Sequence, residues 1–248
     1  MFSVEQLERF QVGGYLVCEE LIHGTELAAF VAIFDELVET GNALAKPDGH
    51  FTLELNQDNE PVSGRLHKVQ GVCVAEPRLR ALAAHAQITD RAAQLLDAES
   101  LDVFGTKFFP KLAGGGTSTH WHQDNYYFGS DSPQVLSCGI YLQDADRENG
   151  CLRVVPGSHR AGQIVDHQQT KGMHGSWTQV EEHHAVDLET RAGTVVLFSA
   201  NLLHGTSDNH SDRTRYSTAW HYVPADLTLE QFVRGKYEDR FTVRPQPA

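Results

Sequence analysis

The first third of the chain carries apolar side chains at helical spacing. The repeat is clearest from residue 27 to residue 38, and Pro77 opens a second amphipathic run that extends to about residue 96. Apolar residues three and four positions apart share one face of a helix. We therefore predict a helical section over about residues 1–100.

From about residue 101, short apolar runs replace the helical pattern and are separated by turn residues. The runs are LDVFGTKFF, QVLSCGIYL, CLRVV, GTVVLF and RYSTAWHYV. Such runs predict strands, and Asn149-Gly150 between two of them favours a tight hairpin turn. Strands at this density predict a mainly β fold over about residues 101–225, with a closed or double-layered antiparallel sheet and helices packed outside.

The chain shows no internal repeat, low-complexity tract or linker, so we expect a single domain over residues 1–248. A polar, histidine-containing stretch at about residues 160–190 interrupts the strand rhythm. Long insertions in compact domains are often lids or binding loops. We interpret this stretch as an inserted lid.

Charge and cysteine usage narrow the possible partners and location. The chain has 20 basic against 33 acidic residues and a formal net charge of -13. Nucleic acid and anionic membranes both need a basic face, so neither is expected as a partner. The four cysteines have no CxxC spacing, which favours free thiols. The N-terminal residues do not resemble a signal peptide, and no stretch approaches the length of a membrane span. We expect a cytoplasmic location; the oligomeric state stays open.

The segment HWHQD contains the strongest candidate for chemistry, because His122 and Asp124 are two residues apart. On an extended strand, such side chains leave the same face. A second histidine from a distant strand, His204 after the run VVLF, could complete a three-ligand cap on a metal. Such a cap leaves coordination sites open, as an Fe(II) oxygenase needs for a bidentate co-substrate and dioxygen.

Arg215 opens the run RYSTAWHYV, eleven residues after His204. Strand alternation places it on one face with Ser217, Ala219 and His221. Small residues around a guanidinium leave room for a ligand, and the guanidinium can donate two parallel hydrogen bonds to a carboxylate. The alternative is an ion pair at the end of the barrel.

Several simpler interpretations compete with this site. A second H-x-D pair, His210 and Asp212, lies in the polar loop NHSDRTR and is interpreted as accidental. Asp124 alone would be a turn or cap residue. The other histidines, His221 among them, are expected at the surface or in loops.

These residues in this order resemble the phytanoyl-CoA dioxygenase-like branch of the 2-oxoglutarate oxygenases, which includes ectoine hydroxylases. WHQD at 121–124 resembles the strand of the first ligands, and ENGCLRVVPGSHR at 148–160 resembles a hairpin-and-turn signature. RAGTVVLF at 191–198 with HGTSDNHSDRTR at 204–215 resembles the closing segment, and LERFQVGGYLV at 7–17 resembles the opening helix and strand. The resemblance implies a double-stranded β-helix (jelly roll, cupin-like) with flanking helices.

The resemblance also implies the roles of individual residues. His122, Asp124 and His204 would bind Fe(II), and Arg215 would hold the distal carboxylate of 2-oxoglutarate. Further candidates for the co-substrate site are Thr206, Ser217, Lys68 and either Lys107 or Lys111, although each lysine taken singly is more often an ordinary surface residue. Side chains just past the ligands and one in the insertion are candidates for the substrate wall, namely Tyr126, Tyr127, Phe128 and Trp177.

The implied activity is hydroxylation of an unactivated C–H bond of a small molecule, with consumption of dioxygen and release of succinate and CO2. The same cofactors could instead support cyclisation, epimerisation or desaturation in natural-product biosynthesis. A third possibility is a non-catalytic jelly-roll binding module. Gly105 stands near the place where ectoine hydroxylases carry a glutamine for their substrate, which argues against ectoine itself. Halogenating relatives lack the carboxylate ligand, so Asp124 argues against halogenation.

Overall fold

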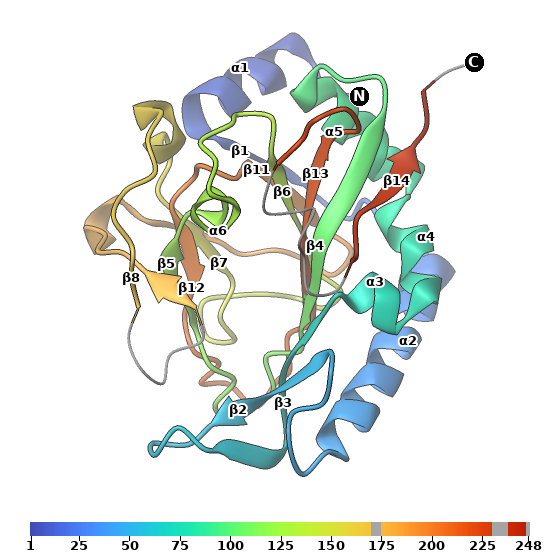
Figure 1. Cartoon of the computed structure of the whole chain (residues 1–248), viewed down its shortest axis with the longest axis vertical. Helices are drawn as coiled ribbons and strands as arrows, with labels where there is room; N and C mark the ends of the chain where they lie inside the picture. The colour runs from blue at the N-terminus through green and yellow to red at the C-terminus, as the bar shows by residue number, and fades with distance from the viewer. Residues whose placement is uncertain (170–174, 230–237, 247–248) are drawn as a thin grey trace.

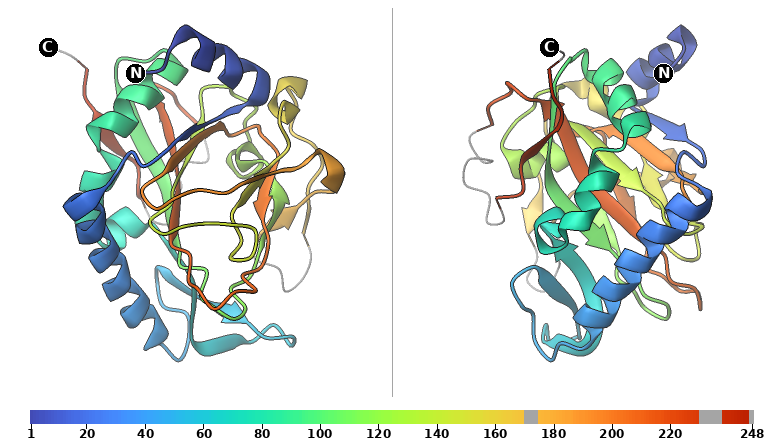
Figure 2. Two further views of the ribbon diagram at one scale, coloured as in Figure 1. Left: turned by 180° about the vertical axis from the view of Figure 1, so that it is seen from behind. Right: turned by 90° about the vertical axis from the view of Figure 1, so that its right-hand side faces the viewer.

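Two antiparallel sheets face each other in the computed structural model, with helices on the outer side of the larger one (Figures 1 and 2). The structure describes residues 1–169, 175–229 and 238–246. The larger sheet has the strand order β1-β11-β6-β13-β4-β3-β2, with β14 paired to β4. The smaller sheet has the order β10-β7-β12-β5, and β8 and β9 form a separate hairpin.

The strands of the described part are β1 (Tyr15–Cys18), β2 (Phe51–Leu55), β3 (Pro61–Gln70), β4 (Leu101–Phe109), β5 (Thr119–His122), β6 (Leu136–Ile140), β7 (Leu152–Val154), β8 (Gln168–Gln169), β9 (Ser176–Trp177), β10 (Val186–Leu188), β11 (Val195–Ser199), β12 (His204–Thr206), β13 (Ser217–Pro224) and β14 (Phe241–Arg244). The helices are α1 (Val4–Gly13), α2 (Gly24–Asn42), α3 (Val72–Ala75), α4 (Arg80–Ala83), α5 (Ala86–Leu96) and α6 (Asp124–Phe128), with 3-10 turns η1 (Pro77–Leu79), η2 (Ser158–Ala161) and η3 (Glu182–His184). This arrangement confirms the predicted jelly roll with flanking helices.

The main hydrophobic core lies between the helices and the larger sheet. Phe34 of α2 packs on Phe108 of β4 with ring centroids 4.4 Å apart. Trp220 and Tyr222 of β13 are fully buried in the same core. The aromatic side chains of RYSTAWHYV therefore lie in the helix-facing core.

A second core fills part of the space between the two sheets. Its buried members come from both sheets and their connections: Tyr141, Ala145, Cys151, Leu152, Val154, Leu188, Val196, Phe198 and Leu202. Every residue of β6 and of β11 is buried, because helices cover one face of these strands and the smaller sheet covers the other. Continuous apolar runs are the sequence pattern of strands that are buried on both faces.

Two local predictions need correction. Besides β1, where the resemblance implied an opening strand, the first 100 residues also contain β2 and β3, which join the larger sheet through β4. Asn149-Gly150 does form a turn, but β6 and β7 on either side belong to different sheets, so this is not a hairpin. Gly150 adopts a positive φ of 82°, which suits a turn that leads the chain from one sheet to the other.

Candidate functional site

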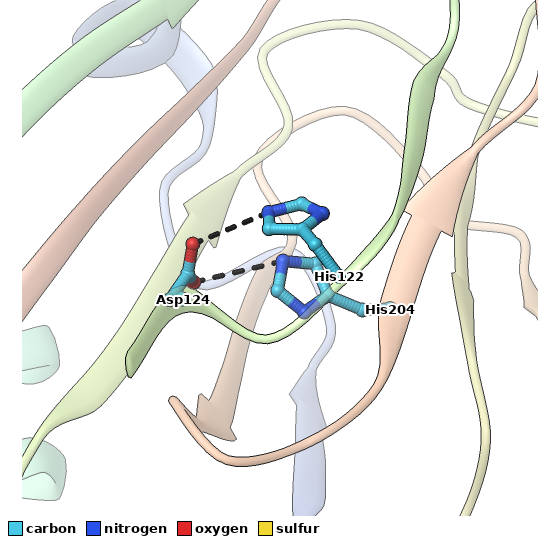
Figure 3. Close-up of side chains that lie close together, drawn as sticks. All are labelled: His122, Asp124 and His204. Carbon is cyan, nitrogen blue, oxygen red and sulfur yellow. Dashed lines mark ion pairs between the residues drawn. The ribbon is translucent and has the colours of Figure 1, made fainter. Parts of the chain in front are cut away.

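The three predicted ligands converge between the sheets (Figure 3). His122 ends β5, His204 begins β12, and these two residues are register partners in the smaller sheet. The Nε2 atom of His122 lies 3.4 Å from Oδ1 of Asp124, and Nε2 of His204 lies 3.6 Å from Oδ2. One ligand atom from each residue lies within 4.8 Å of the others, and all three side chains are buried. The predicted convergence is confirmed.

The chain reaches this arrangement by a different route from the one expected. β5 ends at His122, Gln123 is extended, and Asp124 is the first residue of the short helix α6. The two ligands are therefore not successive inward positions of one strand. A turn directly after the strand brings the carboxylate back toward the imidazole of His122.

Hydrogen bonds to the backbone fix which imidazole nitrogens face the centre. Nδ1 of His122 lies 2.7 Å from the carbonyl oxygen of His120, and Nδ1 of His204 lies 2.9 Å from that of Leu202. A carbonyl oxygen only accepts, so each Nδ1 carries a proton, and in the neutral imidazole Nε2 then presents its lone pair to the centre. Burial, together with the neighbouring His122, lowers the pKa of His204 to about 4, so this imidazole is neutral near pH 7. Two lone pairs and a carboxylate that face one another fit a divalent cation.

Two residues of the larger sheet interact with Oδ2 of the Asp124 carboxylate. The hydroxyl of Ser137 donates to Oδ2 at 2.6 Å, and Nε2 of His221 lies 3.2 Å from the same oxygen. Burial raises the pKa of Asp124, but the imidazoles of His204 and His221 and the hydrogen bonds outweigh burial and leave the pKa well below its usual value. Oδ2 is thereby anchored to the larger sheet, while Oδ1 faces His122.

The prediction that His221 lies at the surface or in a loop is wrong. His221 is buried in β13, where its ring stacks on Phe104 at a centroid distance of 5.1 Å and meets the edge of Phe128 at 4.7 Å. Strand alternation had already placed His221 on the inner face with Arg215. That signal was sufficient to find it.

Arg215 lies in the same cavity as the three ligands. It is buried, it donates to the hydroxyl of Ser217, and its guanidinium carbon lies 5.6 Å from the centre of the Tyr141 ring. Across the described ranges it forms no ion pair with an acidic residue, and its Nε has no hydrogen-bond partner. The alternative of an ion pair at the barrel end therefore receives no support, and the guanidinium of Arg215 remains available to a ligand.

Thr206 and Lys111 adjoin this arginine. Nζ of Lys111 donates to the hydroxyl of Thr206 at 2.8 Å and to the carbonyl oxygen of Ser207. Burial lowers the pKa of Lys111 well below its usual value, and the charge of Arg215 lowers it further. A side chain on Gly150 would come within 2.9 Å of Nζ of Lys111, so glycine makes room for the lysine.

The other two lysines lie elsewhere on the larger sheet. Lys107 lines the cavity with the ligands. Lys68 lies on the neighbouring strand β3, close enough to Lys107 for the charge of Lys107 to lower the pKa of Lys68. Lys111 and Lys107, which the sequence could not rank, therefore occupy different surroundings.

The candidate wall residues divide into two groups. The ring of Tyr127 lies 5.7 Å from that of His122, and its hydroxyl accepts from the backbone N–H of Ser176 at 2.8 Å, next to Trp177 in the β8–β9 hairpin. Tyr126 stacks on His167 at 4.2 Å. Phe128, in contrast, packs beneath the site in a small hydrophobic cluster with Phe104. The structure thus places the two tyrosines and the hairpin beside the ligands and Phe128 below them.

Gln123, between the two ligands of the H-x-D motif, attaches the inserted segment to the site. Its side-chain oxygen accepts from the backbone N–H of Val165 at 2.9 Å, and its backbone N–H donates to Nε2 of His167 at 3.0 Å. No pattern in the sequence indicated this role for Gln123 or His167. The second H-x-D pair, His210 and Asp212, is exposed, which supports its interpretation as accidental.

Two further expectations concern the whole chain. The four cysteines are buried free thiols. Within the described ranges, no helix combines the length and apolar character required to cross a membrane.

Comparison with known proteins places this site in context. Residues 10–217 match the family described as phytanoyl-CoA dioxygenase (PhyH). The ectoine dioxygenase of Bordetella parapertussis is 28% identical over 246 residues, which cover 92% of this chain and 77% of that protein. Among solved structures, EctD from S. alaskensis with bound Fe has a TM-score of 0.73 and 24% identity, covering 92% of this chain and 79% of EctD. EvdO2 from Micromonospora carbonacea var. aurantiaca complexed with 2-oxoglutarate has a TM-score of 0.73 and 22% identity, covering 93% and 94%.

Proposed function

Because the chain belongs to the phytanoyl-CoA dioxygenase (PhyH) family, we propose that it is an Fe(II)- and 2-oxoglutarate-dependent oxygenase of a small molecule. The observation that carries this proposal is one cavity that contains two imidazoles, one carboxylate and a buried arginine that has no acidic partner among the described residues. The first three groups suit ferrous iron, and the fourth suits the distal carboxylate of 2-oxoglutarate. A jelly-roll binding module without catalysis would not need this combination.

The protein side chains orient the reactants and shield them from water. His122, Asp124 and His204 would hold the iron. Arg215, helped by Thr206, Ser217 and Lys111, would bind the far end of 2-oxoglutarate and so set the direction in which the co-substrate lies. The chemistry that iron would supply when held there is activation of dioxygen, coupled to conversion of 2-oxoglutarate into succinate and CO2. Tyr126, Tyr127 and Trp177 would limit access on the side of the β8–β9 hairpin.

Hydroxylation of a C–H bond is the outcome we propose. Cyclisation, epimerisation and desaturation use the same cofactors, and product analysis by mass spectrometry separates the four. A single-domain organisation and a cytoplasmic location stay predictions.

The chelate itself provides the direct test. Anaerobic protein with Fe(II) and 2-oxoglutarate should develop a weak visible absorption band from the bound co-substrate. Asp124→Ala should abolish the band because the carboxylate ligand is lost. Asp212→Ala is the matched control, since it removes the aspartate of an identical H-x-D pair outside the site. A wild-type protein without the band, or an Asp124→Ala variant that keeps it, would overturn the proposal.

A further inference from the structure

Strand β4 contains a β-bulge beside His221. Between the pair of Ala219 with Lys107 and the pair of His221 with Phe104, β4 has one residue more than β13. This stretch contains Gly105, whose φ of 59° lies in the left-handed region that glycine adopts without strain. A bulge next to a functional site commonly changes the direction of a side chain. The position of His221 therefore depends on how this bulge is held.

The carboxylate of Asp239 binds the backbone of the bulge. Oδ1 accepts from the N–H of Gly105 at 3.3 Å, and Oδ2 accepts from the N–H and the hydroxyl of Thr106 at 2.5 and 2.9 Å. Here β4 changes its neighbour, since β3 pairs with residues 107–108 and β14 with residues 101–103. Thr106 is fully buried, and a buried N–H group without an acceptor destabilises the fold. Asp239 therefore stabilises the bulge in the place between these two neighbours.

The ring of His221 lies against the bulge and lines the cavity. A Cβ atom on Gly105 would lie 3.0 Å from Nδ1 of His221, so the ring approaches the glycine too closely for a larger residue without a shift. Phe104, the residue before Gly105, stacks on the same ring at a centroid distance of 5.1 Å. A change in the backbone of the bulge would therefore move the imidazole of His221.

His221 in turn contacts a predicted metal ligand. Its Nε2 atom lies 3.2 Å from Oδ2 of Asp124. An ionised carboxylate only accepts, so Nε2 carries the proton of this hydrogen bond. Partners that hydrogen-bond to a metal ligand fix its orientation and raise the affinity for the metal. Consecutive contacts thus connect Asp239, near the C-terminus, to Asp124.

Given the proposed function, on which this inference rests, we propose that Asp239 is a positioning residue of the iron site. Its carboxylate holds the bulge, the bulge holds the ring of His221, and His221 orients the carboxylate of Asp124. The alternative is that Asp239 only fastens the C-terminal segment to the barrel. Arg240 has that role, because its guanidinium binds Asp102 at 2.7 Å and the carbonyl oxygens of Leu227 and Ala225.

A first test uses the metal-free protein and does not depend on iron. In a nitrogen-15-edited NMR spectrum, the Nε2–H proton of His221 should give a downfield signal, because it is bound to a buried carboxylate. The loss of this signal in His221→Phe assigns it. Asp239→Ala should shift it upfield or remove it by faster exchange with water. Arg240→Met is the matched control and should leave it unchanged, because it loosens the same segment but leaves the bulge bound.

A second test is an anaerobic calorimetric titration with Fe(II). Asp239→Ala should weaken Fe(II) binding about fivefold, less than the loss of a direct partner of the ligand. Asp239→Asn should lose less, because it keeps one acceptor oxygen. Arg240→Met should bind Fe(II) as wild type does, although it and Asp239→Ala should both lower the melting temperature by about 2–4 °C. In the His221→Phe background, Asp239→Ala should cost little further affinity.

The glycine of the bulge provides an independent perturbation. Gly105→Ala should weaken Fe(II) binding about as much as Asp239→Ala does, because the new methyl group displaces the ring of His221. Gly24→Ala is the matched control, since Gly24 has the same φ of 59° and no described atom lies within 4 Å of a Cβ atom there. This variant should bind Fe(II) as wild type does.

Several results would overturn the inference. No Nε2–H signal in wild type, or an unchanged signal or Fe(II) affinity in Asp239→Ala, breaks the connection from Asp239 to Asp124. Equal losses of Fe(II) affinity in Asp239→Ala and Arg240→Met assign Asp239 to fastening alone, and additive losses with His221→Phe exclude action through His221. If Asp239→Ala does not fold, Asp239→Asn and Gly105→Ala decide. A wild type that binds no Fe(II) refutes the proposed function instead, and the signal of the metal-free protein still tests the contacts.

Discussion

Replacement of Ser137 by alanine tests how the protein holds its carboxylate ligand. The hydroxyl of Ser137 donates to Oδ2 of Asp124 at 2.6 Å, and both residues are buried, with exposed fractions of 1% and 6%. A hydrogen bond to a charged group contributes about 1.5–3 kcal/mol. The alanine variant loses this contribution, and His221 remains as a donor to the same oxygen at 3.2 Å.

We expect Ser137→Ala to weaken Fe(II) binding by about tenfold, the lower end of the range for partners of metal ligands. The lower end applies because His221 continues to orient the carboxylate. The measurement is an anaerobic calorimetric titration with Fe(II), accompanied by thermal denaturation of the metal-free protein. Thr89→Val is the control, since it removes a hydroxyl that is buried in α5, away from the site, and should leave Fe(II) affinity unchanged.

A double-mutant cycle decides whether Ser137 acts through Asp124. If it does, Ser137→Ala added to Asp124→Asn should cost less Fe(II) affinity than Ser137→Ala costs in the wild type. Additive losses, or an Fe(II) affinity of Ser137→Ala equal to that of wild type, would refute the reasoning.

Three further predictions concern the co-substrate, the backbone and the pH dependence. Arg215→Met should weaken the binding of 2-oxoglutarate by about 2 kcal/mol or more, roughly 30-fold, in a titration of the visible band. The control Arg213→Met, which changes an exposed arginine, should leave this affinity unchanged. Equal affinities of Arg215→Met and wild type would show that Arg215 does not bind the co-substrate. Gly193→Ala should lower the free energy of unfolding by more than about 3 kcal/mol in a urea titration, because φ is 85° and the new Cβ would lie 1.8 Å from the carbonyl oxygen of Ile22. Gly162→Ala, with φ of 64° and open space around it, should cost only the smaller backbone strain, and equal losses would contradict the close-approach argument. Since the pKa of His204 is about 4 in the folded protein and 6.5 when unfolded, the unfolded chain binds more protons between these values. Stability of the metal-free protein should therefore fall from pH 6.5 to pH 4, and less steeply in His204→Gln; the same slope in both proteins would exclude His204 as a cause.

Local sequence patterns were sufficient for much of the fold and for the centre of the site. Period-two alternation in RYSTAWHYV placed Arg215 on one face with Ser217, Ala219 and His221, and the structure has Arg215 in the cavity and Trp220 in the helix-facing core. The order of His122, Asp124, His204 and Arg215 indicated a metal site beside a carboxylate site. Side-chain direction along a strand depends only on the covalent geometry of the chain, so a single sequence reveals it.

Other features depend on contacts between residues far apart in the chain. The turn that returns Asp124 to His122, the donation from Ser137, and the burial of His221 between Phe104 and Phe128 each require several strands to be in place. The same holds for the position of Lys68 beside Lys107, which the pairing of β3 with β4 determines.

The sequence by itself thus determined which side chains face inward and which chemical groups are available to a metal. Only the tertiary structure decided which of those groups meet, because the register between strands from distant parts of the chain sets the distances, and no local pattern contains that information. Ser137 illustrates this. No sequence pattern distinguishes it, and its role becomes visible only where β6 of the larger sheet brings its hydroxyl to Oδ2 of Asp124.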